Sequence, residues 1–144
     1  MSNIDKIVNS VLLHSSKPVT YFRLSKTLYF LQGLCLVKYN EPLFTEEISA
    51  WTNGPCVPDV YKKFHLYGCY DLRFLLDTNK EFSEKDEFIS STCKELDKYS
   101  DEQLMKMSQN KGMPWEVVWN NGNGRFNEIP VNLIKIRFKE KYES

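Results

Sequence analysis

A broad apolar stripe between Thr20 and Tyr39 constrains the fold of this chain more than any other feature of the sequence. The stripe has helical spacing and is made of Leu24, Leu28, Leu31, Leu34 and Cys35, widened by Phe30 and Val37. Thr20 can cap a helix at its start, and the sequence Asn40-Glu41-Pro42 ends it. A stripe this wide indicates a helix that is covered on several sides. We therefore expect residues 20–39 to form the central helix of the fold.

Shorter periodic segments predict further helices on both sides of the central one. An i, i+3, i+4 pattern of apolar residues begins at Ile4 and ends near His14, before Pro18. Ser83 and Ser100 each begin a sequence that resembles a capping box, the signature of a helix start. Proline in the first turn is a second such signal. The helices predicted after the central one begin near Pro58, Ser83, Ser100, Pro114 and Pro130.

Two segments lack a helical pattern. Residues 46–51 alternate weakly, which predicts a short strand or extended segment, and Asn53-Gly54-Pro55 after them predicts a turn. Residues 71–82 fit either a short strand or an irregular packed segment. A length of 144 residues suits one domain, and there is no repeat or linker. We predict a mostly α, single compact helical domain over residues 1–144, with a short extended or β element between the second and third helices.

The balanced charge of the chain bears on the partners it could bind. There are 19 basic and 19 acidic residues, which give zero net charge. Strong nonspecific binding to nucleic acid needs a basic surplus or a concentrated basic face. The basic residues between Lys135 and Lys141 alternate along a predicted helix, so they spread around it and we expect a solvated face. Contact of this helix with nucleic acid or with an acidic toxin surface is the alternative.

Cysteine and histidine positions indicate neither a metal site nor secretion. The cysteines and histidines are spread without any C-x-x-C pair, so we expect no metal, and we expect no cofactor. The polar start of the chain, residues 1–6, lacks an apolar signal region, and no run of about 18 apolar residues could span a membrane. We expect a cytoplasmic protein with reduced cysteines that behave as small apolar residues. Cys56, in the predicted turn, is the one candidate for an exposed thiol.

No set of residues suggests catalysis. His65 could act as a base, but the sequence shows no serine or cysteine nucleophile with a third, orienting group beside it. His14, at the end of a predicted helix, is explained by the helix dipole. The sequence Asn121-Gly122-Asn123-Gly124 lacks the lysine and Ser/Thr of a phosphate-binding loop, so we expect a surface turn. We predict no catalytic residue and no enzyme activity.

Three short motifs follow one another in a fixed order. They are Leu28-Tyr29-Phe30-x-Gln32-Gly33, then Tyr39-x-x-Pro42-Leu43-Phe44, then Ala50-Trp51-x-x-Gly54-Pro55-x-x-Pro58-x-Val60-Tyr61-x-x-Phe64. A capped helix start at Ser100 and the pair Pro114-Trp115 come after them. In this order and spacing the sequence resembles the Panacea-domain family, the SocA-like and phage-associated antitoxins, from about Thr20 to Phe138.

The resemblance implies the antitoxin of a two-gene toxin–antitoxin pair, which binds its cognate toxin directly. Such a protein either occludes the toxin or hands it to a protease. The family serves chemically unrelated toxins, so the fold alone does not name the partner. Two other classes stay open: a phage or mobile-element accessory protein that binds a host defence protein, and a DNA-binding autoregulator, against which the balanced charge weighs. The sequence indicates no particular oligomeric state.

Residues in and near the motifs are the candidates for contact with a partner, because tryptophan, tyrosine and arginine are enriched in binding hot spots. The candidates are Phe44, Trp51, Asn53, Tyr61, Phe64, Trp115, Arg125 and Phe126. For Trp51 a role in the core is the more usual one for such a residue, and we favour it over partner contact. We expect partner choice to lie in residues 71–82 and 121–126, which match no family pattern.

Overall fold

Residues 3–143 are described in the computed structural model, and most of them are helical. The helices and strands of these residues are α1 (Asn3–His14), α2 (Tyr21–Tyr39), β1 (Ser49–Trp51), β2 (Gly54–Cys56), α3 (Pro58–Phe64), α4 (Asp86–Leu96), α5 (Asp101–Ser108), α6 (Pro114–Trp119) and α7 (Val131–Tyr142). Short 3₁₀ turns lie at His65–Tyr67, Leu72–Leu75 and Asn120–Gly122. The predicted fold class is confirmed, including the β element between the second and third helices.

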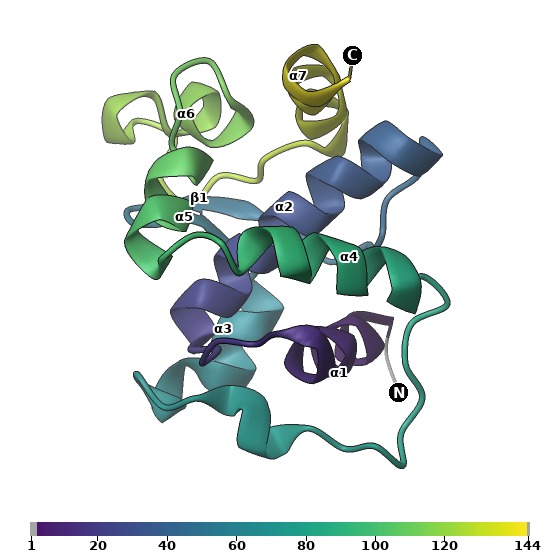
Figure 1. Cartoon of the computed structure of the whole chain (residues 1–144). Helices are drawn as coiled ribbons and strands as arrows, with labels where there is room; N and C mark the ends of the chain where they lie inside the picture. Colours follow the sequence, from purple (N-terminus) through teal and green to yellow (C-terminus); the bar gives the residue numbers. More distant parts are fainter. Residues whose placement is uncertain (1–2, 144) are drawn as a thin grey trace.

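Helix α2 runs through the middle of the molecule, as its broad apolar stripe predicts (Figure 1). The Thr20 hydroxyl accepts a hydrogen bond from the backbone N–H of Arg23 at 3.1 Å, which caps the start of the helix. Asn40 ends the helix in the left-handed conformation, at a φ of 60°. Helices α3, α4, α5 and α7 pack directly against α2, and α1 packs against α4.

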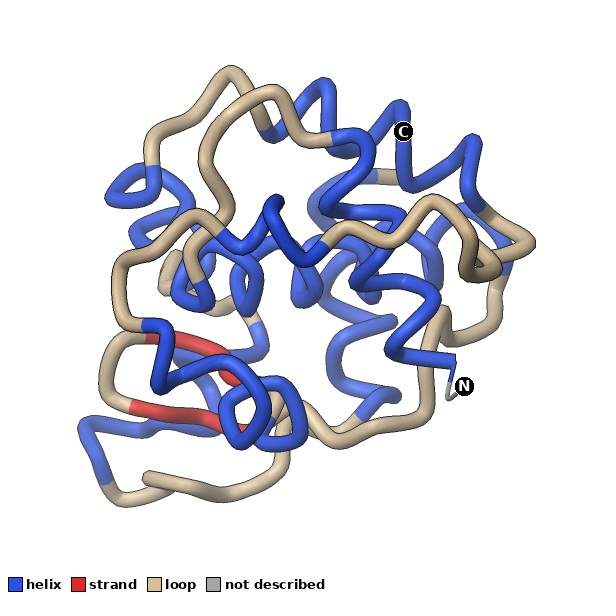
Figure 2. The backbone as a smooth tube through the Cα atoms, turned by 90° about the horizontal axis from the view of Figure 1, so that it is seen from below, coloured by secondary structure: helices blue, strands red, loops and turns tan. Residues whose placement is uncertain are grey.

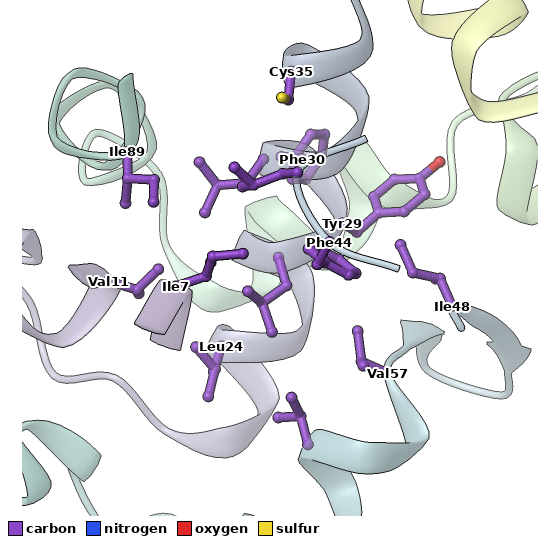
Figure 3. Packing of buried hydrophobic residues seen from close by; sticks show 14 of the residues in the cluster. Ile7, Val11, Leu24, Tyr29, Phe30, Cys35, Phe44, Ile48, Val57 and Ile89 are labelled. Atoms are coloured by element: carbon purple, nitrogen blue, oxygen red, sulfur yellow. The ribbon is translucent and has the colours of Figure 1, made fainter. Parts of the chain in front are cut away.

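The hydrophobic core gathers around this central helix. Figure 3 shows Ile7 of α1 and Ile89 of α4 in one cluster with Leu24 of α2. Two charged side chains of the same helix, Arg23 and Lys26, are buried as well. Buried charges are costly unless they are paired, so Arg23 and Lys26 each need specific contacts within the fold.

Two residues of the first motif tie α2 to distant parts of the chain. The Oε1 atom of Gln32 accepts a hydrogen bond from the backbone N–H of Leu43 at 2.7 Å, and its Nε2 donates to the carbonyl of Phe44 at 2.8 Å. Gly33 faces Phe138 of α7, whose ring occupies the place that a methyl group on residue 33 would take. Gln32 therefore holds the loop after α2 in place, and Gly33 leaves room for α7 to pack against α2.

Strands β1 and β2 form an antiparallel hairpin at one edge of the molecule (Figure 2). Trp51 pairs with Gly54 and Ser49 pairs with Cys56, so the turn is formed by Thr52 and Asn53. The predicted turn at Asn53-Gly54-Pro55 is therefore placed too late, because Gly54 and Pro55 already belong to the second strand.

The segment 126–129 continues the sheet on the other side of β1. The N–H of Phe126 donates to the carbonyl of Ala50 at 2.7 Å, and the N–H of Ala50 donates to the carbonyl of Asn127 at 2.8 Å. The N–H of Ile129 donates to the carbonyl of Ile48 at 2.7 Å. These main-chain bonds hold the loop after α6 beside the hairpin.

The two predicted capping boxes have different outcomes. Ser100 and Gln103 form theirs: the Ser100 hydroxyl accepts from the N–H of Gln103, and the Gln103 amide oxygen accepts from the N–H of Ser100. Ser83 does not, because α4 begins later, at Asp86, and the Ser83 hydroxyl accepts from the N–H of Lys85 instead. The Asp86 carboxylate lies 2.8 Å from Nε2 of His14, which joins the end of α1 to the start of α4.

Residues 71–82 form an irregular packed segment, the second of the two structures predicted for them. A 3₁₀ turn covers Leu72–Leu75, and Leu72 is buried in the core. The carboxylate of Asp71 caps this turn by accepting from the N–H of Arg73 at 3.1 Å.

Within residues 3–143, no helix has the length and apolar content needed to cross a bilayer.

The four cysteines are free, and the expectation for Cys56 is wrong: its side chain is buried in the hairpin, and Cys69 is the exposed one. Burial raises the pKa of the Cys35 and Cys56 thiols to about 11 and that of Cys93 to about 12. Such thiols stay protonated and unreactive at neutral pH.

We therefore predict that a thiol reagent modifies one cysteine of the native protein quickly, and the other three only after unfolding. Mass spectrometry after a short pulse of maleimide reports the count and the site. Changing Cys69 to serine should remove the fast reaction. Rapid labelling of the Cys69→Ser variant would show that the hairpin or the core opens under native conditions.

Candidate functional site

A pocket opens between α2, the hairpin, α3 and the loop after α6, with a volume of about 310 Å³. We refer to it as the Trp51 pocket. It is lined by Tyr21, Phe22, Ser25, Lys26, Trp51, Thr52, Asn53, Gly54, Cys56, Tyr61, Arg125 and Phe126. Five of the eight residues predicted to contact a partner belong to this lining: Trp51, Asn53, Tyr61, Arg125 and Phe126. Figure 1 shows β1, α5 and α6 gathered at this end of the molecule.

Trp51 is clasped by two other aromatic rings. Its ring centroid lies 4.8 Å from that of Tyr61 and 5.5 Å from that of Phe126, both in edge-on geometry. Tyr61 in turn stacks on His65 at 4.2 Å. The indole is half-buried, which lies between the core role that we favoured and a free surface position. We call the rings of Trp51, Tyr61 and Phe126 the aromatic wall. The rings hold one another in place, and each remains at least partly exposed to solvent.

Phe126 is presented to solvent in an unusual backbone conformation. Its φ is 68°, in the left-handed region that a bulky side chain rarely adopts, and its side chain is 58% exposed. The hydrogen bond of its N–H to the carbonyl of Ala50 holds it there. Arg125 stacks on its ring, with 4.8 Å between the guanidinium carbon and the ring centroid. Backbone strain of this kind is concentrated at functional sites.

The other three candidates lie elsewhere. Phe44 is 1% exposed and belongs to the core. Trp115 is buried, and its Nε1 donates to the carbonyl of Trp51 at 2.9 Å. This hydrogen bond joins α6 to β1. Phe64 lines a different pocket with Tyr67, on the side of α1.

Sequence reasoning missed the residues that α2 contributes to the Trp51 pocket. Lys26 is 4% exposed, and its Nζ donates to the carbonyl of Pro55 at 3.4 Å and lies 4.3 Å from the ring centroid of Phe22. Burial lowers the pKa of Lys26 to about 8, and the nearby Cys56 thiol opposes this shift. Phe22 and Phe30, four residues before and after Lys26 on the same helix face, were the signal that could have found it.

Gly54 and Lys26 depend on each other. A Cβ atom on residue 54 would lie 3.1 Å from the Lys26 Cε and 3.5 Å from its Nζ, and the φ of Gly54 is 118°. A glycine therefore serves both the turn of the chain and the close approach of the lysine. Of the Gly-Pro pair in the third motif, Gly54 lines the Trp51 pocket and Pro55 provides the carbonyl that accepts from Lys26.

A second group of apolar side chains is exposed away from this pocket. Leu66, Tyr70 and Phe74 follow α3 within the segment that leads into the second 3₁₀ turn, and Phe74 is 66% exposed. The ring of Phe74 meets that of Tyr67 at 5.7 Å. We call these three residues the Phe74 cluster.

The fold and the site define a small helical protein with an aromatic pocket that carries positive charge. A family model described as antitoxin SocA-like, Panacea domain, matches residues 24–116, so the chain belongs to this family. Among its relatives is the protein named Antitoxin SocA from Caulobacter vibrioides (strain NA1000 / CB15N), which is 28% identical over 138 residues, covering 85% of this chain and 73% of the relative. No solved structure matches the chain.

Membership of this family supports an antitoxin role for the chain. The matched residues 24–116 include Lys26, Trp51 and Tyr61. Four lining residues of the pocket lie outside the matched range: Tyr21, Phe22, Arg125 and Phe126. In residues 3–143, no group of three or more His, Cys, Asp or Glu side chains could hold a metal ion.

Proposed function

We propose that this protein neutralises a toxin protein by binding it directly, and that the Trp51 pocket lies at the centre of the contact. Membership of an antitoxin family supports the toxin as the partner. The clasped and half-exposed Trp51 ring supports the position of the contact. The proposal requires no catalytic group.

The aromatic wall has the properties of a binding hot spot. Trp, Tyr and Arg carry much of the energy in protein interfaces, and here Trp51, Tyr61 and Arg125 lie together. The rings of Trp51 and Tyr61 already contact each other, and Arg125 lies against the ring of Phe126. Little side-chain freedom is therefore lost when a partner binds. An ordinary specific interface buries about 800 Å² on each partner, which is roughly a tenth of the 7715 Å² accessible surface of this protein.

The test uses the product of the open reading frame next to this gene. We expect this product to arrest growth when it is induced alone and to be harmless when it is expressed with the antitoxin. We also expect the two proteins to purify together. A harmless neighbour, or a toxic one that never associates with this chain, would contradict the proposal.

Substituting Phe126 by alanine should weaken the complex by about 30-fold, the size of a typical hot spot, with little change in stability because the side chain is exposed. Phe74→Ala is the comparison, since it removes from the Phe74 cluster a similarly exposed ring, which lies in residues 71–82, the other segment expected to govern partner choice. Titration calorimetry with the purified toxin measures both variants. Loss of binding in Phe74→Ala and not in Phe126→Ala would move the interface to the other surface.

Two mechanisms of neutralisation remain to be separated by experiment. Occlusion requires only the interface, so the toxin should persist in cells as an inactive complex. Delivery to a protease requires in addition that the toxin level falls when the antitoxin is present. Immunoblots of the toxin after its synthesis is stopped, with and without the antitoxin, distinguish the two.

A further inference from the structure

The Trp51 pocket holds a positive charge that the described residues do not neutralise. Lys26 lies among aromatic side chains, and in residues 3–143 no carboxylate forms an ion pair with it. Its single hydrogen bond goes to the carbonyl of Pro55, at the long distance of 3.4 Å. An ammonium group has three donors, so two of them have no acceptor among the described residues.

The other polar groups of the pocket are also suited to an anion. The Ser25 hydroxyl is buried and lacks a hydrogen-bond partner of ordinary geometry among the described residues, with only the weakly accepting sulfur of Cys56 beside it. Arg125 stands at the rim against the ring of Phe126 and forms no ion pair within residues 3–143. The lining contains no aspartate or glutamate. The pocket thus offers donors and positive charge without an acceptor of opposite charge.

We propose that the Trp51 pocket receives the side chain of a glutamate from the toxin, whose carboxylate pairs with the ammonium of Lys26 and accepts a hydrogen bond from Ser25. This inference rests on the proposed function. Charge complementarity argues for an acidic group, and the 4% exposure of Lys26 argues for a long one. The two methylene groups of glutamate can pack between Trp51 and Phe22 while the carboxylate reaches the floor.

The size of the pocket favours one side chain over a free metabolite. Pockets for small molecules range from about 300 to 1,000 Å³, and this one lies at the lower limit with about 310 Å³. An ion pair formed there is shielded from water, so it contributes more to binding than a pair at the rim. The lowered pKa of about 8 leaves most Lys26 side chains charged at neutral pH, ready to pair.

The first experiment measures the toxin complex of a Lys26→Met variant, which keeps the length of the side chain and removes its charge. We expect binding about 100-fold weaker than for the unmodified protein. Thermal unfolding should show no loss of stability, because an unpaired buried charge is removed. Lys38→Met is the matched control: it is the same change on the same helix, outside the pocket lining, and should leave the affinity unchanged.

The second part of this experiment identifies the glutamate. Each glutamate of the toxin is changed to methionine, and each change is combined with Lys26→Met. The pairing residue is the one whose loss has no further effect in the Lys26→Met background, as a double-mutant cycle requires. If every pair of changes is additive, or if Lys26→Met binds as tightly as the unmodified protein, the inference is overturned while the proposed function stands.

A measurement made without the toxin distinguishes a failure of the glutamate inference from a failure of the proposed function. NMR titration of the antitoxin with N-acetyl-glutamate N′-methylamide should shift the signals of Gly54 and the Trp51 indole, and the glutamine analogue should not. The Lys26→Met variant should show no shift. If no toxin complex forms, the proposed function fails, and this titration still decides whether the pocket accepts a carboxylate. A small carboxylate that copurifies with the protein and blocks the titration would overturn the glutamate as occupant.

Discussion

Replacing Arg23 by methionine is expected to lower the free energy of unfolding by about 3 kcal/mol, because three hydrogen bonds from a buried guanidinium are lost. The Arg23 guanidinium is 3% exposed and reaches from α2 to the junction of α4 and α5. It donates to the carbonyls of Leu96 and Tyr99 at 2.9 and 3.0 Å and to the carboxylate of Asp101 at 2.8 Å. Methionine would remove this donor from all three acceptors, and within residues 3–143 the two carbonyls would keep only the N–H of Tyr99 and the distant Nζ of Lys17.

The control for this prediction is Arg73→Met. Arg73 pairs with Asp71 at the surface, where about a third of each side chain is exposed. Such pairs contribute about 1 kcal/mol or less. Urea denaturation should therefore show a midpoint lowered by roughly 1–2 M for Arg23→Met and by much less for Arg73→Met. Equal losses in the two variants would mean that burial adds nothing to the contacts of Arg23.

The second large effect is expected at Gly33, where alanine should destabilise the fold by about 2–3 kcal/mol. Inside an exposed helix the same change would stabilise by about 1 kcal/mol. Here the added methyl group would overlap the ring of Phe138, which is buried and boxed in by Tyr29 and Phe30 with centroid distances of 5.3 and 6.2 Å. Helix α7 must shift to relieve the overlap.

A double-mutant cycle tests this cause. Phe138→Leu alone should destabilise by leaving a cavity, and in combination with Gly33→Ala the new methyl group should fill part of it. We expect the double variant to be less destabilised than the sum of the single ones by about 1 kcal/mol. Strictly additive losses in thermal unfolding would show that the contact with Phe138 is not the reason for the glycine.

The helices were predictable wherever their signals are local. Thr20 and Ser100 cap as the sequence predicts, and Pro58 begins a helix. Ser83 fails because a tertiary contact competes with the local one: Asp86 points to His14 of another helix and is too short to reach back as a glutamate would. Contacts between distant residues leave no trace in local patterns.

The same reason explains which site residues were found. Trp51 and Tyr61 are aromatic residues of the third motif, and Phe126 is an aromatic residue in the segment expected to govern partner choice, so residue type and position pointed to all three. Phe44 lies two residues after Pro42 in a segment without a helical pattern, so its burial was not evident, and Gln32 binds its backbone carbonyl in the core. Lys26 was missed because it lies opposite Leu24 and Leu28 on the helix, the side on which a charged residue is usually solvated.

The main-chain attachment of residues 126–129 to β1 has a consequence for how this protein can change over generations. Bonds between backbone groups hold the segment in place and do not depend on the identity of its side chains. Mutations at Arg125 or Asn123 can therefore accumulate while the frame keeps its position. Under the proposed function, the hairpin is kept while the side chains of residues 121–126 are free to diverge. A lineage could exchange one toxin for another by rewriting a few codons of this loop.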